Sequence, residues 1–153
     1  MKRIAIFTEG KTERIFVKKL LEEIAGRKNI SIKLYELRGG GQSGKPQTKT
    51  QKVGINQPSA KYEALIYDCG GDEKVTSDII EQYNELVSKG VSKILGLRDL
   101  YGQKPDGTFR LPTDLVRAEK GLKLILKKRL AQDNSLPIPI HIVIAVMCVL
   151  RTT

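Results

Sequence analysis

The chain has 153 residues and a net charge of +10 at pH 7, with 40% hydrophobic and 29% charged residues. This length and composition predict a single globular domain, and two cysteines are too few for a disulfide framework. The pI of about 9.7 favours a polyanionic partner, nucleic acid before a membrane surface, and a basic surface that serves only solubility is the alternative.

Neither the first residues nor the apolar run near the end has the pattern of a secretory signal or a membrane-spanning segment. Met1-Lys2-Arg3 precedes only a short apolar run, which is not the pattern of a secretory signal. The longest apolar run, 138–150, is too short to cross a bilayer. We therefore expect a cytoplasmic protein that does not enter a membrane.

Short apolar runs alternate with amphipathic segments along the chain. The pattern predicts strands over 4–8, 30–37, 63–68, 92–98 and 140–150, and helices over 11–25, 76–89 and 115–130. In the first helix the predicted buried stripe consists of Ile15, Phe16, Leu20, Leu21 and Ile24. Alternating strands and helices predict an α/β fold with a mostly parallel central sheet and helices on both faces.

Residues 38–61 follow neither a helical nor a strand period. They are rich in Gly, Gln, Thr, Ser and Lys and contain no acid, so we interpret them as a long mobile basic loop. The stretch 39–46 nearly matches a phosphate-binding Walker loop, but Pro46 stands where the Mg²⁺-binding hydroxyl belongs. We favour contacts to a nucleic-acid backbone through Lys45, Lys49, Lys52 and Lys61, with a disordered hairpin connection as the alternative.

Three predicted strands end in an acid. Glu9 follows the first strand, and Asp68 and Asp99 end two later ones. Ligands of α/β folds bind at the carboxyl ends of the strands, so parallel neighbours would bring these carboxylates together. The alternative is that each acid only stabilises the N-terminus of the helix that follows it.

Carboxylates that converge in this way suit a hard divalent cation. Mg²⁺ or Mn²⁺ takes oxygen ligands and can polarise a phosphoryl group, so we expect metal binding by Glu9, Asp68 and Asp99, with Asp72 in reserve. Glu9 could instead stay unligated as a general acid or base, because neighbouring acids raise its pKa.

Basic residues gather at the start of the first helix and along the last one. Lys11 begins the first predicted helix, and the last helix contains Arg117, Lys120, Lys123, Lys127, Lys128 and Arg129. We expect Lys11, Lys123 and Lys127 to contact nucleic acid through salt-dependent contacts that do not read sequence. A solvated helix face explains the same residues without a ligand.

Two short motifs resemble those of Toprim proteins, the superfamily of topoisomerases, primases and overcoming-lysogenization-defect nucleases. Phe7-Thr8-Glu9-Gly10-Lys11-Thr12-Glu13 resembles the first Toprim motif, and Asp99-Leu100-Tyr101-Gly102 resembles a later motif of small, poorly characterised Toprim-like proteins. The resemblance implies a Toprim-like fold, metal-dependent chemistry on nucleic acid and, in some systems, an ATPase partner.

The chain departs from the Toprim pattern at three places. The usual Asp-x-Asp is replaced by the wider Asp68-Cys69-Gly70-Gly71-Asp72, and Tyr101 stands where a second acid is usual. The relatives also carry an acid-bearing segment after the last strand, whereas Met147-Cys148-Val149-Leu150 contains no acid. A metal site built only from the three strand-end acids would lack ligands that the family has.

These observations together predict one Toprim-like domain over 1–153 that carries out Mg²⁺-dependent phosphodiester chemistry on nucleic acid, with nuclease-type hydrolysis of DNA favoured. The alternative is a non-catalytic nucleic-acid-binding or accessory module that keeps the fold without a complete metal site. A third interpretation is an inactive form truncated at its C-terminus. Because 140–150 would be buried on both faces of a sheet, we also expect self-association through this region.

Overall fold

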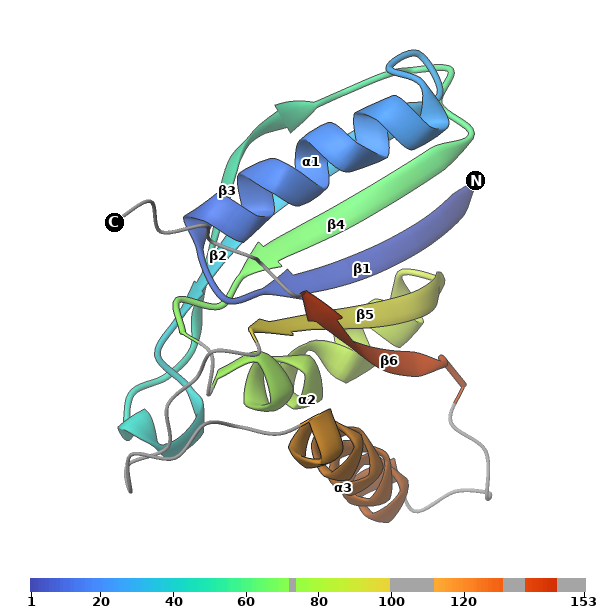
Figure 1. Ribbon diagram of the computed structural model, residues 1–153. Coiled ribbons are helices and arrows are strands. Elements are labelled where there is room, and N and C mark those ends of the chain that lie inside the picture. The colour runs from blue at the N-terminus through green and yellow to red at the C-terminus, as the bar shows by residue number, and fades with distance from the viewer. Residues whose placement is uncertain (72–73, 100–111, 131–136, 146–153) are drawn as a thin grey trace, which may run out of the picture.

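The computed structural model describes residues 1–71, 74–99, 112–130 and 137–145, which form a six-stranded sheet and three α-helices (Figure 1). The strand order is β3-β2-β4-β1-β5-β6, and β3 alone runs antiparallel to its neighbour. The predicted α/β fold with a mostly parallel sheet is therefore confirmed. None of the helices in these described ranges is long and apolar enough to span a membrane.

Apart from β3 and η1, which were not predicted, the strands and helices begin and end close to the predicted positions. The strands are β1 (Lys2–Thr8), β2 (Ile30–Arg38), β3 (Thr48–Ile55), β4 (Tyr62–Asp68), β5 (Val91–Asp99) and β6 (Ile140–Ala145). The helices are α1 (Lys11–Ala25), α2 (Lys74–Ser88) and α3 (Pro112–Leu130), with a short 3₁₀ helix, η1 (Gly41–Ser43). Residues 146–150, the end of the last predicted strand, lie outside the described residues.

Helices cover both faces of the sheet. On one face α2 and α3 close over a core that includes the fully buried Phe7, Tyr67, Ile79 and Leu122. The rings of Phe7 and Tyr67 stack with their centroids 4.5 Å apart, and Tyr35 stacks on the other side of Tyr67. On the opposite face, α1 covers a smaller cluster. It contains Val17 and the strand residues whose side chains point away from the first core, such as Ile6 and Ile66. Period-two alternation along the parallel strands thus builds both cores.

The buried side of α1 differs from the predicted stripe. Arg14 and Val17 are the buried residues of this helix, whereas Phe16 and Ile24 remain 54% and 73% exposed. Ile15 and Leu20 are also exposed, and only Leu21 of the predicted stripe packs against the core. The prediction was wrong because a helix with apolar residues on two sides has no single periodic stripe, and contact with the sheet selected the narrower side.

Residues 38–61 also differ from the prediction, because they contain regular structure. After η1, the chain forms β3, which pairs antiparallel with β2 from Arg38–Thr48 to Ile32–Ile55. No alternation of apolar residues marks this strand, because β3 is an edge strand and seven of its eight residues are exposed. The segment is therefore a hairpin rather than a loop, and its mobility stays a prediction.

The connection between η1 and β3 is expected to be the first part of this hairpin that a protease cuts. The backbone of β3 is paired with β2, while residues 44–46 are exposed and lie between η1 and the strand. Because Lys45 precedes Pro46, a protease of broad specificity is the suitable probe. Mass spectrometry of early fragments should show cleavage within 41–47 before cleavage within 48–55. Earlier cleavage inside β3 would mean that the strand pairing is the weaker part.

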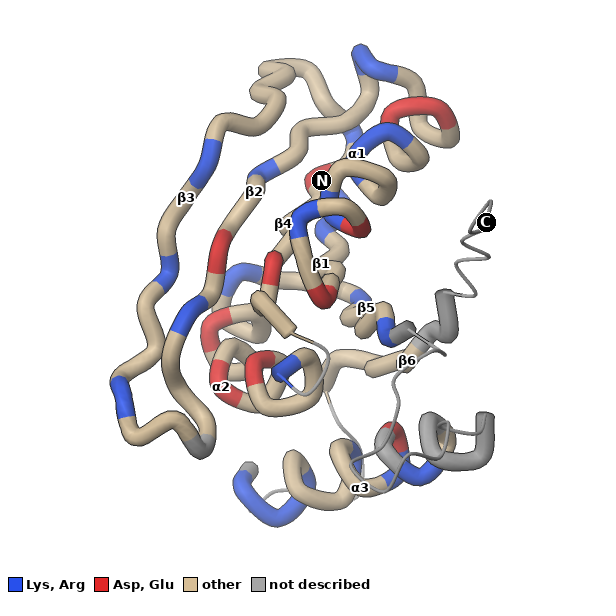
Figure 2. Tube along the Cα trace, turned by 60° about the vertical axis from the view of Figure 1, so that its left-hand side comes forward, with Lys and Arg blue, Asp and Glu red and all other residues tan. Residues whose placement is uncertain are grey.

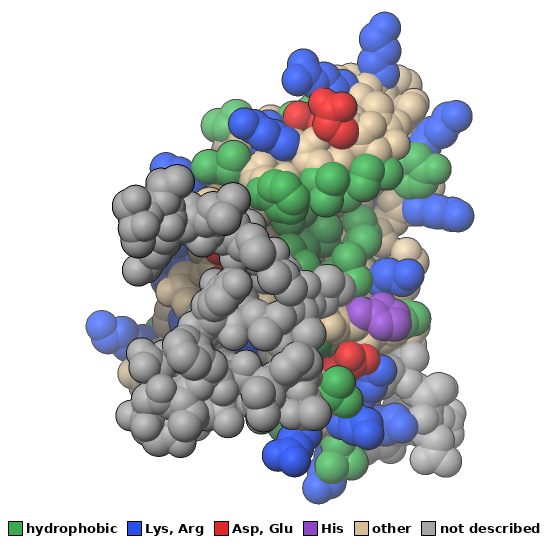
Figure 3. Space-filling view, viewed as in Figure 1, with side chains coloured by type: hydrophobic (Ala, Val, Ile, Leu, Met, Phe, Trp, Pro, Cys, Tyr) green, Lys and Arg blue, Asp and Glu red, His purple; other side chains and the backbone are tan. Residues whose placement is uncertain are grey.

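Hydrophobic side chains are exposed on the face of the molecule that carries α1 (Figure 3). They include Phe16, Leu20 and Ile24 of α1, and Leu95 and Leu97 of β5 are partly buried on the same face of the sheet. The predicted self-association stays a prediction, and this face adds a second surface for it. A Phe16→Lys variant should sediment with a lower average mass than the wild type at the same high concentration. If the wild type and the variant both sediment with the mass of a monomer, the predicted self-association is contradicted.

Candidate functional site

The carboxyl ends of β2, β4, β1 and β5 meet at one edge of the sheet, which we call the carboxyl edge. Thr8, the last residue of β1, pairs with Asp68, the last residue of β4, and Asp68 pairs in turn with Glu36 of β2. The buried Thr8 hydroxyl donates to the Tyr67 carbonyl over 3.0 Å, which holds these two strand ends together.

The strands that carry the three predicted acids are parallel neighbours. Glu9 follows β1 directly, while Asp68 ends β4 on one side of it and Asp99 ends β5 on the other. Phe7 of β1 pairs with Gly96, so Asp99 lies three residues further along β5 and Glu9 two residues further along the β1 chain. The backbone therefore brings these three positions to the same edge, within about two residue steps, or roughly 7 Å, along the strand direction.

Asp68 is the acid of this edge whose surroundings the structure defines best. Its side chain is 2% exposed, and its Oδ1 accepts a hydrogen bond of 3.0 Å from the Gly70 N–H. The Arg38 guanidinium lies 3.4 Å from each carboxylate oxygen, through Nη1 to Oδ1 and Nη2 to Oδ2. On the other side, Arg14 Nη1 lies 3.8 Å from Oδ2. The negative charge of Asp68 is thus offset by two arginines.

Arg14 also links this carboxylate to a second one. Its Nη1 lies 3.3 Å from Oε1 of Glu36, whose Oε2 lies 3.7 Å from Nζ of Lys52 on β3. Burial raises the pKa of Glu36, but Lys52, Arg14 and Arg38 outweigh this effect and hold the pKa below its ordinary value. Glu36 therefore stays ionised and gives the buried Arg14 a partner.

The remaining predicted ligands are only partly described. Glu9 is partly buried in the turn between β1 and α1, where the Arg14 N–H bonds the Gly10 carbonyl as the helix begins. The backbone of Asp99 ends β5, but its side chain lies outside the described part. Asp72 and the motif residues 100–102 also lie outside the described residues.

Carboxylate oxygens at adjacent strand ends are the right donors for Mg²⁺ or Mn²⁺. Among the side chains that the structure describes, no three carboxylate, imidazole or thiol groups lie close enough to hold a metal ion. Asp68 fits such an ion in its chemistry and its fixed orientation, but the guanidinium of Arg38 occupies the approach to its oxygens. A cation at Asp68 requires Arg38 to move.

A buried polar network connects the β2–β3 hairpin to α2 next to this edge. Asp78 is fully buried, and its Oδ1 accepts a hydrogen bond of 2.9 Å from Gln47. Gln82 donates to the Gln47 side-chain oxygen over 2.6 Å. Burial raises the pKa of Asp78, and it also raises the pKa of the neighbouring Cys69 thiol far above its usual range, so this cysteine is not an activated nucleophile.

Most of the lysines predicted to bind nucleic acid lie on β3 and α3 (Figure 2). Lys11, Lys45 and Lys61 are exposed, at the start of α1, before β3 and before β4, and Lys127 is exposed on α3. The other three have acidic partners: Lys49 pairs with Glu85, Lys52 with Glu36, and Lys123 with Glu119. These ion pairs reduce the local positive charge that the sequence suggested.

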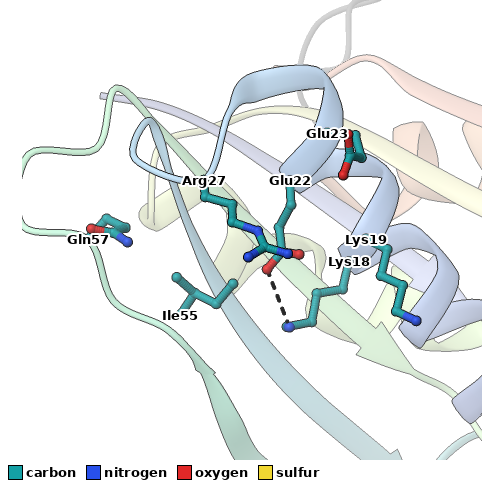
Figure 4. A pocket seen from close by; sticks show the side chains of 7 residues that line it. All are labelled: Lys18, Lys19, Glu22, Glu23, Arg27, Ile55 and Gln57. Atoms are coloured by element: carbon teal, nitrogen blue, oxygen red, sulfur yellow. Dashed lines mark hydrogen bonds and ion pairs between the residues drawn. The ribbon is translucent and has the colours of Figure 1, made fainter.

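Two hollows of the surface lie away from the carboxyl edge. One, of about 530 Å³, lies between α1 and the end of β3 and is lined by Lys18, Lys19, Glu22, Glu23, Arg27, Ile55 and Gln57 (Figure 4). Its Lys18 and Glu22 neutralise each other over 3.4 Å. The other, of about 360 Å³, has a mainly apolar lining that includes Ile4, Leu21 and Tyr62. Neither is lined by any of the predicted acids, and the only predicted nucleic-acid contact among the lining residues is Lys61, in the second hollow.

Sequence reasoning missed Arg14, Glu36 and Arg38. Arg14 occupies the same side of α1 as Val17 and Leu21, three and seven residues later, which is the spacing of one helix face. Glu36 and Arg38 continue the alternation of Leu34 along β2. Both signals were present in the sequence, but they become meaningful only once the sheet-facing side of α1 and the order of the strands are known.

Comparison of the chain with protein family models, with curated proteins and with solved structures finds no significant match.

Proposed function

We propose that the carboxyl edge carries out Mg²⁺- or Mn²⁺-dependent phosphodiester chemistry on nucleic acid, with hydrolysis of DNA as the favoured reaction. The observation that carries this proposal is the order β4-β1-β5, which brings the ends of three acid-bearing parallel strands together. Crevices at the carboxyl ends of such strands are where α/β proteins bind ligands.

Each acid has a role in the proposal. Asp68 and Asp99 are the proposed metal ligands, with Asp72 in reserve, and Glu9 is a ligand or the general acid or base. A bound cation would supply Lewis-acid polarisation of the phosphoryl oxygen. Glu9 would accept or donate the proton, and the first turn of α1 would direct its backbone N–H groups towards the phosphate. The arginines at this edge would bind phosphate oxygens by charge-assisted hydrogen bonds.

The resemblance of the two short motifs supports a Toprim-like identity for the domain, which we include in the proposal. The mostly parallel sheet with helices on both faces is consistent with that identity. By the same resemblance alone, an ATPase is a proposed partner. A reducing cytoplasm is the proposed location, since the buried Cys69 is a free thiol.

A cleavage assay tests the proposal. Labelled single- and double-stranded DNA and RNA should be incubated with the protein and Mg²⁺ or Mn²⁺, and with excess EDTA as the control. Cleavage that requires the cation and falls sharply in an Asp99→Asn variant is the expected result. Cation-independent cleavage, or equal cleavage by the variant, would contradict the proposed roles.

A non-catalytic nucleic-acid-binding module is the second candidate. It is favoured by the pairing of Asp68 with Arg14 and Arg38, which neutralises the carboxylate without a cation. This candidate predicts binding of nucleic acid that is unchanged by EDTA and absence of cleavage under every metal condition. The same assay, combined with a binding measurement, separates the two candidates.

Binding of nucleic acid should weaken steeply as salt rises, because each neutralised phosphate contributes a slope of about −0.9 to log K against log salt. Replacing Lys123 and Lys127 with Gln should reduce the magnitude of the slope by about 1 to 2, and less for Lys123 because it is paired with Glu119. Fluorescence anisotropy with a labelled duplex measures the slope.

The matched control for this measurement removes the same charge elsewhere. Lys2 and Lys28 are exposed near the amino ends of the strands, so their double replacement by Gln should leave the slope nearly unchanged. If the slope of log K against log salt falls equally in both double variants, it reflects the net charge of the protein rather than contacts made by α3.

A further inference from the structure

Arg38 lies over the carboxylate of Asp68 with a geometry that uses most of its donors. Its two terminal nitrogens each lie 3.4 Å from one carboxylate oxygen. Nη1 also donates to the backbone carbonyls of Asp68, over 3.0 Å, and Leu37, over 2.8 Å. The guanidinium thus contacts two carboxylate oxygens and two backbone carbonyls, which restricts its orientation more than a single contact would.

Gly70 makes the room that this arrangement needs. Its φ is +75°, and a Cβ at this position would lie 2.9 Å from Nη1 and 3.0 Å from Cζ of Arg38. Any other residue at position 70 would push the guanidinium off the turn. The Gly70 N–H at the same time holds Oδ1 of Asp68, so the turn orients the carboxylate and accommodates the arginine above it.

The exposure of the two arginines shows which of them can leave. The Asp68 side chain is 2% exposed and that of Arg14 is 9% exposed, whereas the Arg38 side chain is 49% exposed. A ligand that approaches Asp68 from solvent therefore meets Arg38. Solvent weakens an ion pair whose arginine is half-exposed, so the Arg38 contact can be exchanged at little cost in free energy. Arg14, by contrast, is held between Glu36 and Asp68.

We infer that Arg38 is an exchangeable latch on Asp68. In the free protein the guanidinium covers the carboxylate; when a divalent cation binds Asp68, Arg38 is released and turns to a phosphodiester oxygen of the substrate. Cation binding and phosphate binding are then coupled through this one side chain. The inference rests on the proposed function, because it assigns the regulation of the same site.

Titration of Mn²⁺ alone, followed by calorimetry, tests the latch on the full chain. Arg38→Gln should bind Mn²⁺ about threefold to fivefold more tightly than the wild type, because the competing cation is gone. Arg3→Gln is the matched control, since Arg3 pairs with Glu63 at the other end of the strands over 3.0 Å, and it should leave the affinity unchanged.

A second readout distinguishes a latch from a merely structural arginine. With Mn²⁺ present at saturation, a thymidine dinucleotide should bind Arg38→Gln several-fold more weakly than the wild type. The same substitution then shifts the two affinities in opposite directions, which loss of folding would not do.

The outcomes separate the latch from the proposed function. Equal Mn²⁺ affinities for the wild type and Arg38→Gln, with binding abolished in Asp68→Asn, would overturn the latch and leave the metal site standing. Absence of Mn²⁺ binding in every variant, Arg38→Gln included, would overturn the proposed metal chemistry and the latch with it.

Discussion

Replacement of Glu9 by Gln is expected to lower the rate of cation-dependent phosphodiester cleavage by about 100-fold or more. A positioned general acid or base contributes roughly 10²- to 10⁴-fold, and an amide cannot take that role or replace a carboxylate as a ligand of Mg²⁺. Because Gln is nearly isosteric with Glu, the free energy of unfolding should change by about 1 kcal/mol or less. Single-turnover cleavage and urea denaturation measure the two quantities.

Glu23→Gln is the matched control for this substitution. Glu23 lies exposed near the C-terminal end of α1, on the same helix that follows Glu9 but remote from the carboxyl edge. It changes the same charge, so a uniform electrostatic effect on substrate binding would appear in both variants. Cleavage that persists at the wild-type rate in Glu9→Gln would remove Glu9 from the proposed mechanism.

Replacement of Asp68 by Ala is expected to lower the free energy of unfolding by about 3 kcal/mol. Removing one partner of a buried ion pair costs about 3–5 kcal/mol because the other charge is left uncompensated. The lower end of this range of destabilisation applies here, because the Arg38 side chain is 49% exposed and can be solvated when its partner is removed. The buried Arg14 cannot be solvated in this way, and Glu36 would be its one remaining acidic partner among those described here. Urea denaturation should show a lower midpoint with an unchanged slope.

A double-mutant cycle tests the physical reason for this loss. If the cost comes from the uncompensated charge of Arg14, then Arg14→Met combined with Asp68→Ala should be less destabilised than the sum of the two single variants. The coupling between side chains in contact is about 0.5–3 kcal/mol. Strictly additive losses would mean that Asp68 stabilises the fold through its contacts with the Gly70 N–H and Arg38 rather than with Arg14.

Asp68 therefore needs two kinds of substitution, because it serves both stability and the proposed chemistry. Asp68→Asn keeps the acceptor for the Gly70 N–H and loses the charge, so loss of cation binding can be measured in a protein that still folds. Asp68→Ala measures the structural contribution. A loss of activity in the alanine variant alone would not identify Asp68 as a ligand.

Most of the strands and helices could be predicted from the sequence, and so could the edge of the sheet that carries the three acid positions. β1 and β4 each contain a short continuous apolar run, and such runs become strands of a parallel sheet buried on both faces. The helix α1 begins at Lys11 and ends at Ala25, as predicted, because Gly10 and Gly26 interrupt the amphipathic pattern on both sides. A regular alternation of strands and helices then requires parallel neighbours, whose carboxyl ends share one edge.

Tertiary structure alone decided three features of the protein. β3 exists because β2 offers it an unpaired backbone edge, and backbone hydrogen bonds leave no mark on side-chain periodicity. The sheet, rather than hydrophobicity, selected the Arg14 side of α1, because Asp68 and Glu36 lie beneath that side and give the buried guanidinium its partners. The pairing of Arg38 with Asp68 depends on the positive φ of Gly70. All three depend on contacts between residues far apart in the chain, which local patterns of propensity and charge do not encode.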